Sequence, residues 1–142
     1  MPFVRPANPA DLAALQAFDE FQEVTAEVLR AGNCIVAGFD DTVYGYVIIS
    51  RSFFGRRFVE LLFVHPDQRR KGLADALLTF AEDAVPAEAL WVSTALGNFP
   101  MQYLLNRRGY KHSGVVHDLA KVPELIYHKP ARQAAGVTPS SG

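Results

Sequence analysis

The segment 61-LLFVHPDQRRKGLADALLTFAED-83 decides the fold. Its opening residues 61–64 form an apolar run that is typical of a buried strand. A helix is predicted after this run, because apolar side chains recur there at helical spacing: Leu73, Leu77, Phe80 and Ala84. Three consecutive cations, residues 69–71, precede Gly72 where that helix begins. Cations are unfavourable there because the free N–H groups of a helix start are already positive, so the segment predicts a bound anion.

The six residues RRKGLA at 69–74 supply the parts of such an anion site. Gly72 permits a tight turn and the close approach of a ligand, and Ala74 leaves the next turn of backbone uncovered. Successive N–H groups would point at phosphate oxygens, supported by the helix dipole and by three cationic side chains. The segment is neither a Walker A loop nor the triple-glycine dinucleotide fingerprint. Taken alone, the six residues fit an ordinary solvated turn equally well.

Length, charge and cysteine content limit the number of domains, the kinds of binding partner and the cellular compartment. A chain of 142 residues with 49% hydrophobic residues is long enough for one domain with its own core. The formal net charge of −1 predicts no attraction to nucleic acid or to an anionic membrane, and no segment has the roughly 18 apolar residues of a membrane span. The single cysteine, Cys34, fits a reducing cytoplasm and is expected to be buried in its apolar stretch. We therefore expect a cytoplasmic protein whose partners are small molecules or other proteins, and a homodimer stays open.

The order of helices and strands is predicted as βααβββαβαββ around one mixed sheet. Asn8 and Pro9 begin a helix, residues 21–30 form a second one, and hairpin turns fall at residues 40–42 and at Gly55. Later elements are expected at these positions: a strand at 89–95, a helix from Asn98 to Gly109, and strands at 110–119 and 124–129. One domain is predicted over residues 1–129, and the small and polar tail 130–142 is predicted to be disordered.

Three motifs in this order resemble those of the GCN5-related N-acetyltransferase (GNAT) superfamily, over residues 3–129. The central signature of that family is Arg or Gln, two variable residues, Gly, one variable residue, then Gly or Ala, and residues 69–74 match it. A strand that ends in a valine, a spacer and a proline usually precedes the signature, as in ELLFVHP at 60–66. A later helix that starts at asparagine and ends in glycine and an aromatic residue is matched by Asn98, Gly109 and Tyr110.

The resemblance implies an α/β (α+β) fold with about seven mostly antiparallel strands, flanking helices, and an opening between the fourth and fifth strands. Acetyl-CoA would be the cosubstrate, and no metal would be needed. Its pantetheine arm would bind main-chain groups of Leu62, Phe63 and Val64. Its pyrophosphate would bind main-chain N–H groups of the turn: Arg69, Arg70, Lys71, Gly72, Leu73 and Ala74. Asn98 would contact the pantetheine arm and also cap its helix.

Family members transfer acetyl directly to an amine, which must first lose a proton because its pKa is about 10. The resemblance makes Glu60, four residues before Val64, the base, although an exposed strand glutamate without a role is an equally good interpretation. The family often has a tyrosine acid four residues before the glycine of the late helix, and here that residue is Leu105. No acid is assigned, since neither Tyr110 nor Tyr127 has support.

The acceptor is less constrained by the sequence. Acidic residues in segments that shape the acceptor pocket of this family would suit a cationic amine: Glu20, Glu23, Glu27, Asp118 and Glu124. The four histidines lack metal-ligand spacing, so no metal site is expected. The sequence thus predicts an N-acetyltransferase (EC 2.3.1.-) that acts on a primary amine of a small molecule or protein. The alternatives are a non-catalytic acyl-CoA-binding regulatory module, which Leu105 motivates, and a toxin directed at aminoacyl-tRNA, which the net charge of −1 disfavours.

Overall fold

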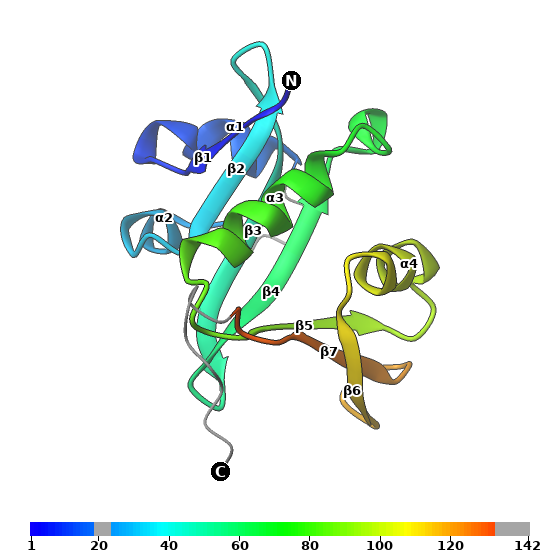
Figure 1. Ribbon diagram of the computed structural model, residues 1–142. Coiled ribbons are helices and arrows are strands. Elements are labelled where there is room, and N and C mark those ends of the chain that lie inside the picture. The colour runs from blue at the N-terminus through cyan, green and yellow to red at the C-terminus, as the bar shows by residue number, and fades with distance from the viewer. Residues whose placement is uncertain (19–23, 133–142) are drawn as a thin grey trace. The chain divides into compact units, whose positions relative to one another are not determined.

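The computed structural model describes residues 1–18 and 24–132, and its helices and strands follow the predicted order (Figure 1). The strands are β1 (Phe3–Pro6), β2 (Cys34–Phe39), β3 (Thr42–Phe53), β4 (Arg56–Val64), β5 (Leu90–Ala95), β6 (Lys111–Val116) and β7 (Glu124–Lys129). The helices are α1 (Leu12–Phe18), α2 (Ala26–Arg30), α3 (Leu73–Ala84) and α4 (Phe99–Arg107), with short 3₁₀ helices η1 (Pro9–Asp11) and η2 (Pro66–Gln68). The seven strands form one sheet in the order β1-β2-β3-β4-β5-β7-β6, which confirms the predicted class.

The chain divides into two compact parts. The first contains residues 1–50 and 59–81, with β1, β2, most of β3, the end of β4, α1, α2 and most of α3. The second contains residues 51–58 and the chain from Glu82 onward, with the tip of the β3–β4 hairpin, β5, α4, β6 and β7. Residues 133–142 of the predicted tail lie outside the described residues. Across the described ranges 1–18 and 24–132, no helix is both long and apolar enough to span a bilayer.

In the first part, helices cover both faces of the β2–β4 strands. Tyr46 of β3 packs against Phe18 of α1, with ring centroids 6.0 Å apart. At the neighbouring position, an added Cβ on Gly45 would lie 3.5 Å from Leu77 of α3, so α3 lies on the opposite face. The core on the α1 and α2 side consists of Leu15, Val24, Leu29, Cys34, Val36, Tyr46, Ile48 and Phe63. The predicted burial of Cys34 is therefore confirmed.

The predicted hairpins are confirmed by their turns. Asp40 and Asp41 join β2 to β3 with φ values of 47° and 65°, and Phe54 and Gly55 join β3 to β4 with 53° and 73°. Two successive residues in the left-handed region are what a two-residue turn between twisted strands requires. The second predicted helix is shorter than expected: Thr25 caps α2 by accepting the Val28 N–H at 3.2 Å, and residues 21–23 lie outside the described residues.

The buried face of α3 differs from the predicted one. Leu73 and Leu77 are buried as expected, but Ala84 is exposed and Phe80 is only partly buried. The remaining buried residues are Leu78 and Ala81 instead. The helix is rotated toward Leu78, because covering a leucine removes far more apolar area from water than covering Ala84 would.

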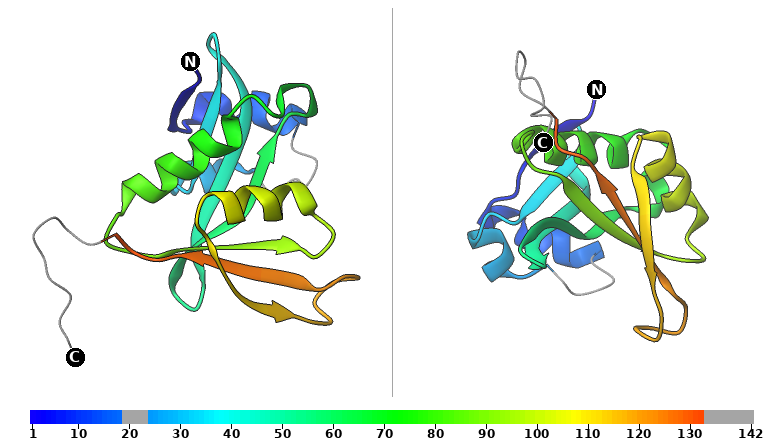
Figure 2. Two further views of the ribbon diagram at one scale, coloured as in Figure 1. Left: turned by 45° about the vertical axis from the view of Figure 1, so that its right-hand side comes forward. Right: turned by 60° about the horizontal axis from the view of Figure 1, so that its bottom comes forward.

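The second part is built on β5, β7 and β6, with α4 over one face (Figure 2). β7 pairs antiparallel with both neighbours, placing Val92 opposite Tyr127 and Lys111 opposite His128. One partly buried carboxylate joins four segments of this part. Glu82, in the last turn of α3, accepts hydrogen bonds from Arg108 at 2.8 Å, from the Tyr110 hydroxyl at 2.6 Å and from Lys129 at 3.1 Å. The end of α3, the end of α4, the start of β6 and the end of β7 are therefore bound to one side chain.

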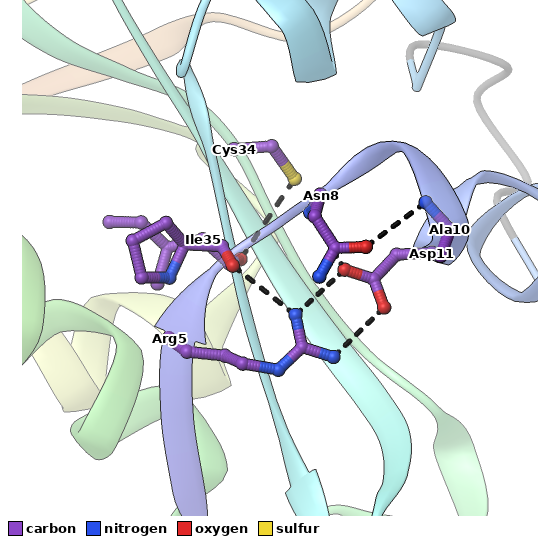
Figure 3. A network of polar contacts seen from close by, with 7 residues as sticks. Arg5, Asn8, Ala10, Asp11, Cys34 and Ile35 are labelled. Atoms are coloured by element: carbon purple, nitrogen blue, oxygen red, sulfur yellow. Dashed lines mark hydrogen bonds and ion pairs between the residues drawn. The ribbon is translucent and has the colours of Figure 1, made fainter.

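A capping box fixes the N-terminal segment of the first part (Figure 3). The Asn8 side chain accepts the Ala10 N–H at 3.0 Å, and Asp11 accepts the Asn8 N–H at 2.8 Å. The Arg5 guanidinium donates to both oxygens of Asp11, at 2.7 and 2.9 Å. The Arg5 hydrogen bonds are the main cause that lowers the pKa of the Asp11 carboxyl, against an opposing effect of burial.

We expect Asp11→Asn to lower the free energy of unfolding by about 1–2 kcal/mol at pH 7, since the Arg5 pair and the cap are both weakened. The pKa of Asp11 is lower in the folded than in the unfolded chain. Its stabilising effect is therefore complete above the unfolded pKa of about 3.9 and is lost as the pH falls through the folded value. Urea unfolding at pH 7 and pH 3 measures this. The variant should lie well below the parent at pH 7, and the difference should be smaller at pH 3.

Asp41→Asn is the matched control, because Asp41 is exposed in a hairpin turn where asparagine is equally accommodated. It should leave the free energy of unfolding unchanged at both pH values. A constant gap between Asp11→Asn and the parent across that pH range would contradict the ionic role of Asp11.

Candidate functional site

The connection from β4 to α3 is the feature that the sequence singled out. His65 follows Val64 and caps η2, with its ring nitrogen Nδ1 accepting the Asp67 N–H at 3.2 Å. Residues 69–72 then lead to Leu73, the first residue of α3. Two residues of this turn are left-handed, Arg70 with φ 64° and Gly72 with φ 85°. The conformational freedom predicted for Gly72 is thus used.

The main-chain N–H groups of residues 69–74 have no acceptor within the described part of the chain. On either side the main chain is paired: Gln68 N–H donates to His65 at 2.9 Å, and Ala76 N–H donates to Gly72 at 3.0 Å. An added Cβ at Gly72 would meet nothing within 4 Å, so the space above the turn is open. A row of six main-chain donors at a helix start, beneath open space, is the geometry of an anion site.

The three cations of the turn do different things. Arg69 turns back onto β4, where its Nε donates to the Val64 carbonyl at 3.0 Å and its guanidinium lies 5.6 Å from the centre of the Phe63 ring. Lys71 donates to the Gln68 side chain at 3.2 Å, and Arg70 is exposed. All three cationic side chains had been expected to support the anion site. The Arg69 side chain instead fixes the turn to β4.

The end of β4 lies close to β3. A Cβ on Gly45 would come within 3.0 Å of the Phe63 carbonyl and 3.3 Å of Val64, which makes glycine necessary at that point of β3. The His65 N–H donates to the Tyr44 carbonyl at 2.7 Å, so the two chain segments stay close one residue beyond Val64. Main-chain groups of β4 up to Val64 are thus held in a defined position directly before the turn.

Glu60, the expected base, is an exposed residue of β4. The Ser50 hydroxyl of β3 donates to its Oε1 at 2.5 Å. Sequence reasoning missed Ser50. The two-residue turn at Phe54 and Gly55 would place residue 50 opposite residue 59, so the turn does not by itself predict the contact with Glu60.

Sequence reasoning also missed an aromatic group around His65. The His65 ring lies 6.0 Å from Phe18 and 6.4 Å from Tyr44, and Phe18 stacks on Phe63 at 5.9 Å. No local pattern joins these residues, because Phe18 belongs to α1 and Tyr44 to β3.

In the second part, Asn98 caps α4 as predicted, with its side chain accepting the Met101 N–H at 3.3 Å. Leu105 is fully buried, so it belongs to the hydrophobic core. Tyr103 is 70% exposed and Tyr127 is buried against His112. Arg108 binds Glu82, which supports a structural role for the arginine at the end of this helix.

Tyr110 is chemically unsuited to donate a proton. Burial is the main cause that raises the pKa of its hydroxyl, and the hydrogen bond to Glu82 raises it further. The hydroxyl therefore keeps its proton at any physiological pH, and Glu82 already accepts it.

The remaining candidates belong to other segments of the chain. Within residues 1–18 and 24–132, no group of three or more His, Cys, Asp or Glu is placed to hold a metal ion. Of the acidic residues expected near an acceptor, Glu27 lies in α2 and Glu124 begins β7, while Asp118 follows β6. Glu20 and Glu23 lie outside the described residues.

We expect Tyr110→Phe to lower the free energy of unfolding by about 1–2 kcal/mol, because it removes one hydrogen bond from the partly buried carboxylate of Glu82. Its rate of CoA release should stay within twofold of the parent. Tyr103→Phe is the control and should change neither quantity, since its side chain is exposed. A tenfold loss of rate in Tyr110→Phe at unchanged stability would instead identify Tyr110 as an acid.

The comparisons with known proteins agree with this geometry. The sequence model of the Acetyltransferase (GNAT) family matches residues 4–110. A search of curated proteins gives no match.

Solved structures resemble the whole chain. A GNAT-family acetyltransferase of Bacillus cereus is 26% identical with a TM-score of 0.84, and the similarity covers 94% of this chain and 99% of that one. The ribosomal-protein-S18-alanine N-acetyltransferase of Escherichia coli is 16% identical with a TM-score of 0.78, and 98% and 99% are covered. A less similar structure, a putative streptothricin acetyltransferase of Bacillus anthracis in complex with acetyl coenzyme A, is 12% identical with a TM-score of 0.72, covering 92% and 98%. The resemblance inferred from the three motifs is confirmed, and the chain belongs to the GNAT family of acetyltransferases.

Proposed function

We propose that this protein is an N-acetyltransferase that transfers acetyl from acetyl-CoA directly to a primary amine of a small molecule or a protein. The observation that carries the proposal is the row of N–H groups at residues 69–74, which have no acceptor among the residues that the structure describes. A diphosphate presents several anionic oxygens close together, and converging main-chain donors at a helix start bind such a group well. Membership of an acetyltransferase family makes the diphosphate of acetyl-CoA the natural occupant.

The rest of acetyl-CoA would lie along residues that precede the turn in the sequence. Its pyrophosphate would bind Arg69, Arg70, Lys71, Gly72, Leu73 and Ala74 through their N–H groups. Its pantetheine arm would bind the main chain of Leu62, Phe63 and Val64, with Asn98 as a further contact. The Val64 carbonyl accepts a bond from Arg69, but a carbonyl oxygen has two lone pairs and can accept a second.

Glu60 is the base in this proposal. Its carboxylate takes a proton from the ammonium form of the acceptor, directly or through a water molecule. The neutral nitrogen attacks the thioester carbonyl carbon, the C–N bond forms and the C–S bond breaks. The nitrogen, which is positively charged after the attack, gives its surplus proton to water to leave the amide. CoA leaves as a thiolate, and water protonates it afterwards, because Leu105 supplies no proton at the position where the family often has a tyrosine.

The acceptor class stays broad. The names of the similar structures include an enzyme for a protein alanine and one for streptothricin, so both protein and small-molecule amines are candidates. A second candidate function is an acyl-CoA-binding regulatory module without turnover, which the apolar residue Leu105 favours. CoA release separates the two functions.

We expect Gly72→Glu to weaken acetyl-CoA binding at least about 100-fold, because a carboxylate beside the turn repels the diphosphate and displaces two or more charge-assisted hydrogen bonds. Isothermal titration with acetyl-CoA measures this. Gly32→Glu is the matched control: it also has a positive φ, 74°, with nothing within 4 Å, so it imposes similar backbone strain away from the turn. Equal affinity of Gly72→Glu and Gly32→Glu would refute the phosphate site.

We expect CoA release above the rate of hydrolysis with at least one amine among spermine, kanamycin and a peptide with a free N-terminal alanine. With that amine, Glu60→Gln should slow turnover about 100-fold at neutral pH while the acetyl-CoA affinity stays unchanged, because only proton removal is lost. Saturable acetyl-CoA binding without release across the panel would favour the regulatory module. A parental rate in Glu60→Gln would remove Glu60 from the mechanism.

A further inference from the structure

We infer that His65 orders the turn at residues 69–74 before acetyl-CoA binds, so that the affinity for acetyl-CoA depends on this histidine. The inference deepens the proposed function and rests on acetyl-CoA occupying that turn. His65 acts through the main chain around it and needs no contact with the cosubstrate, so it is a positioning residue.

His65 connects β3 to the start of the turn through three hydrogen bonds. Its main-chain N–H donates to the Tyr44 carbonyl at 2.7 Å, which joins it to β3. Its carbonyl accepts the Gln68 N–H at 2.9 Å, and its ring nitrogen Nδ1 accepts the Asp67 N–H at 3.2 Å. The last two bonds close η2, the short helix that ends directly before Arg69. One residue therefore determines where the chain enters the turn.

The bond made by the His65 ring matters because of the residue that follows it. Pro66 has no N–H group, so the Asp67 N–H is the first donor of η2 that needs a partner. Asparagine, aspartate and serine usually accept such a bond, and here a histidine ring does so. The Asp67 carboxylate lies 3.8 Å from Nδ1, beyond hydrogen-bond distance, so the ring binds the main-chain N–H of Asp67.

Rings from two other elements fix the direction of the His65 side chain. The centre of its ring lies 6.0 Å from that of Phe18 and 6.4 Å from that of Tyr44, both in edge-to-face arrangements. Phe18 in turn stacks on Phe63 at 5.9 Å, and Phe63 belongs to the core around Tyr46. Nδ1 therefore faces η2 because of contacts with α1 and β3, which do not belong to the connection itself.

The turn beyond η2 needs such support. Arg70 and Gly72 are left-handed, and a side chain such as that of Arg70 stays in this region only where the surrounding backbone is held. In the proposed function the N–H groups of residues 69–74 bind the diphosphate, so they do not order the free turn. Contacts at its ends must do so, and His65 supplies those at the end that follows β4. A turn that is ordered in advance loses less conformational entropy on binding and therefore binds more tightly.

Titration of acetyl-CoA into three variants tests the inference. His65→Leu removes the acceptor but keeps an apolar side chain against Phe18 and Tyr44, and it should weaken binding about tenfold, since the turn is then ordered only during binding. His65→Asn places a favoured capping residue at the same position and should bind within about threefold of the parent. His112→Leu is the matched control, because the His112 ring also lies edge to face on a tyrosine, Tyr127, and it should keep the parental affinity.

Trypsin measures the order of the turn in the free protein, without any ligand. The turn contains three cleavage sites, after Arg69, Arg70 and Lys71, and the exposed Lys121 between β6 and β7 is a reference site. His65→Leu should be cleaved about tenfold faster at the turn and at the parental rate after Lys121, because cleavage follows the population of locally open chain. His65→Asn should be cleaved at the turn within about threefold of the parental rate.

Three results would overturn the inference: His65→Leu binds acetyl-CoA as tightly as the parent, His65→Asn binds as weakly as His65→Leu, or cleavage in His65→Leu rises equally at the turn and after Lys121. The last result would indicate destabilisation of the whole protein. A parent that does not bind acetyl-CoA would refute the proposed function and the inference with it. Equally tight binding by the parent and by His65→Leu would refute the inference alone.

Discussion

The structure centres on a helix start whose main-chain donors have no acceptor among residues 1–18 and 24–132. These donors are the six N–H groups of residues 69–74; an added Cβ at Gly72 would meet nothing within 4 Å, and two residues of the turn, Arg70 and Gly72, are left-handed. For a side chain such as that of Arg70, this conformation costs on the order of 1 kcal/mol. Local strain of this kind persists only where the surroundings hold it, and it is concentrated at binding sites.

Two side-chain contacts hold the turn in place without occupying its main-chain donors. The Arg69 guanidinium joins the turn to the last carbonyl of β4, and His65 caps the short helix η2 that leads into it. Neither contact involves a main-chain N–H group of residues 69–74. Arg69 therefore accounts for one of the three cations: its guanidinium stabilises the turn through the Val64 carbonyl and the Phe63 ring.

The local parts of this arrangement could be predicted from the sequence, because neighbouring residues determine them. Asn8 and Asn98 cap their helices, Gly72 takes a positive φ, and the hairpin turns fall where aspartates and glycine permit them. The GNAT family could also be predicted, because its motifs are contiguous in the chain.

The parts that could not be predicted depend on contacts between distant segments. Glu82 meets Arg108, Tyr110 and Lys129, which lie 26, 28 and 47 residues away. The direction of the Arg69 side chain depends on where the end of β4 lies, and the rotation of α3 toward Leu78 depends on the sheet beneath it. The periodicity within α3 places Ala84 on the same apolar stripe as Leu73 and Leu77, so it does not predict that Leu78 is buried instead.

The ordinary pKa values of an amine and of a thiol explain why acetyl transfer needs a general base but can proceed without a general acid. An alkylamine with a pKa of about 10 is almost fully protonated at neutral pH, so an acceptor amine cannot attack before a base removes its proton. A thiol has a pKa of about 8.5, so a thiolate leaving group is only slightly unfavourable in water at the same pH. An apolar Leu105 and a Tyr110 that keeps its proton for Glu82 are therefore compatible with turnover. The same argument does not excuse the loss of a base, a role that the proposed function assigns to Glu60.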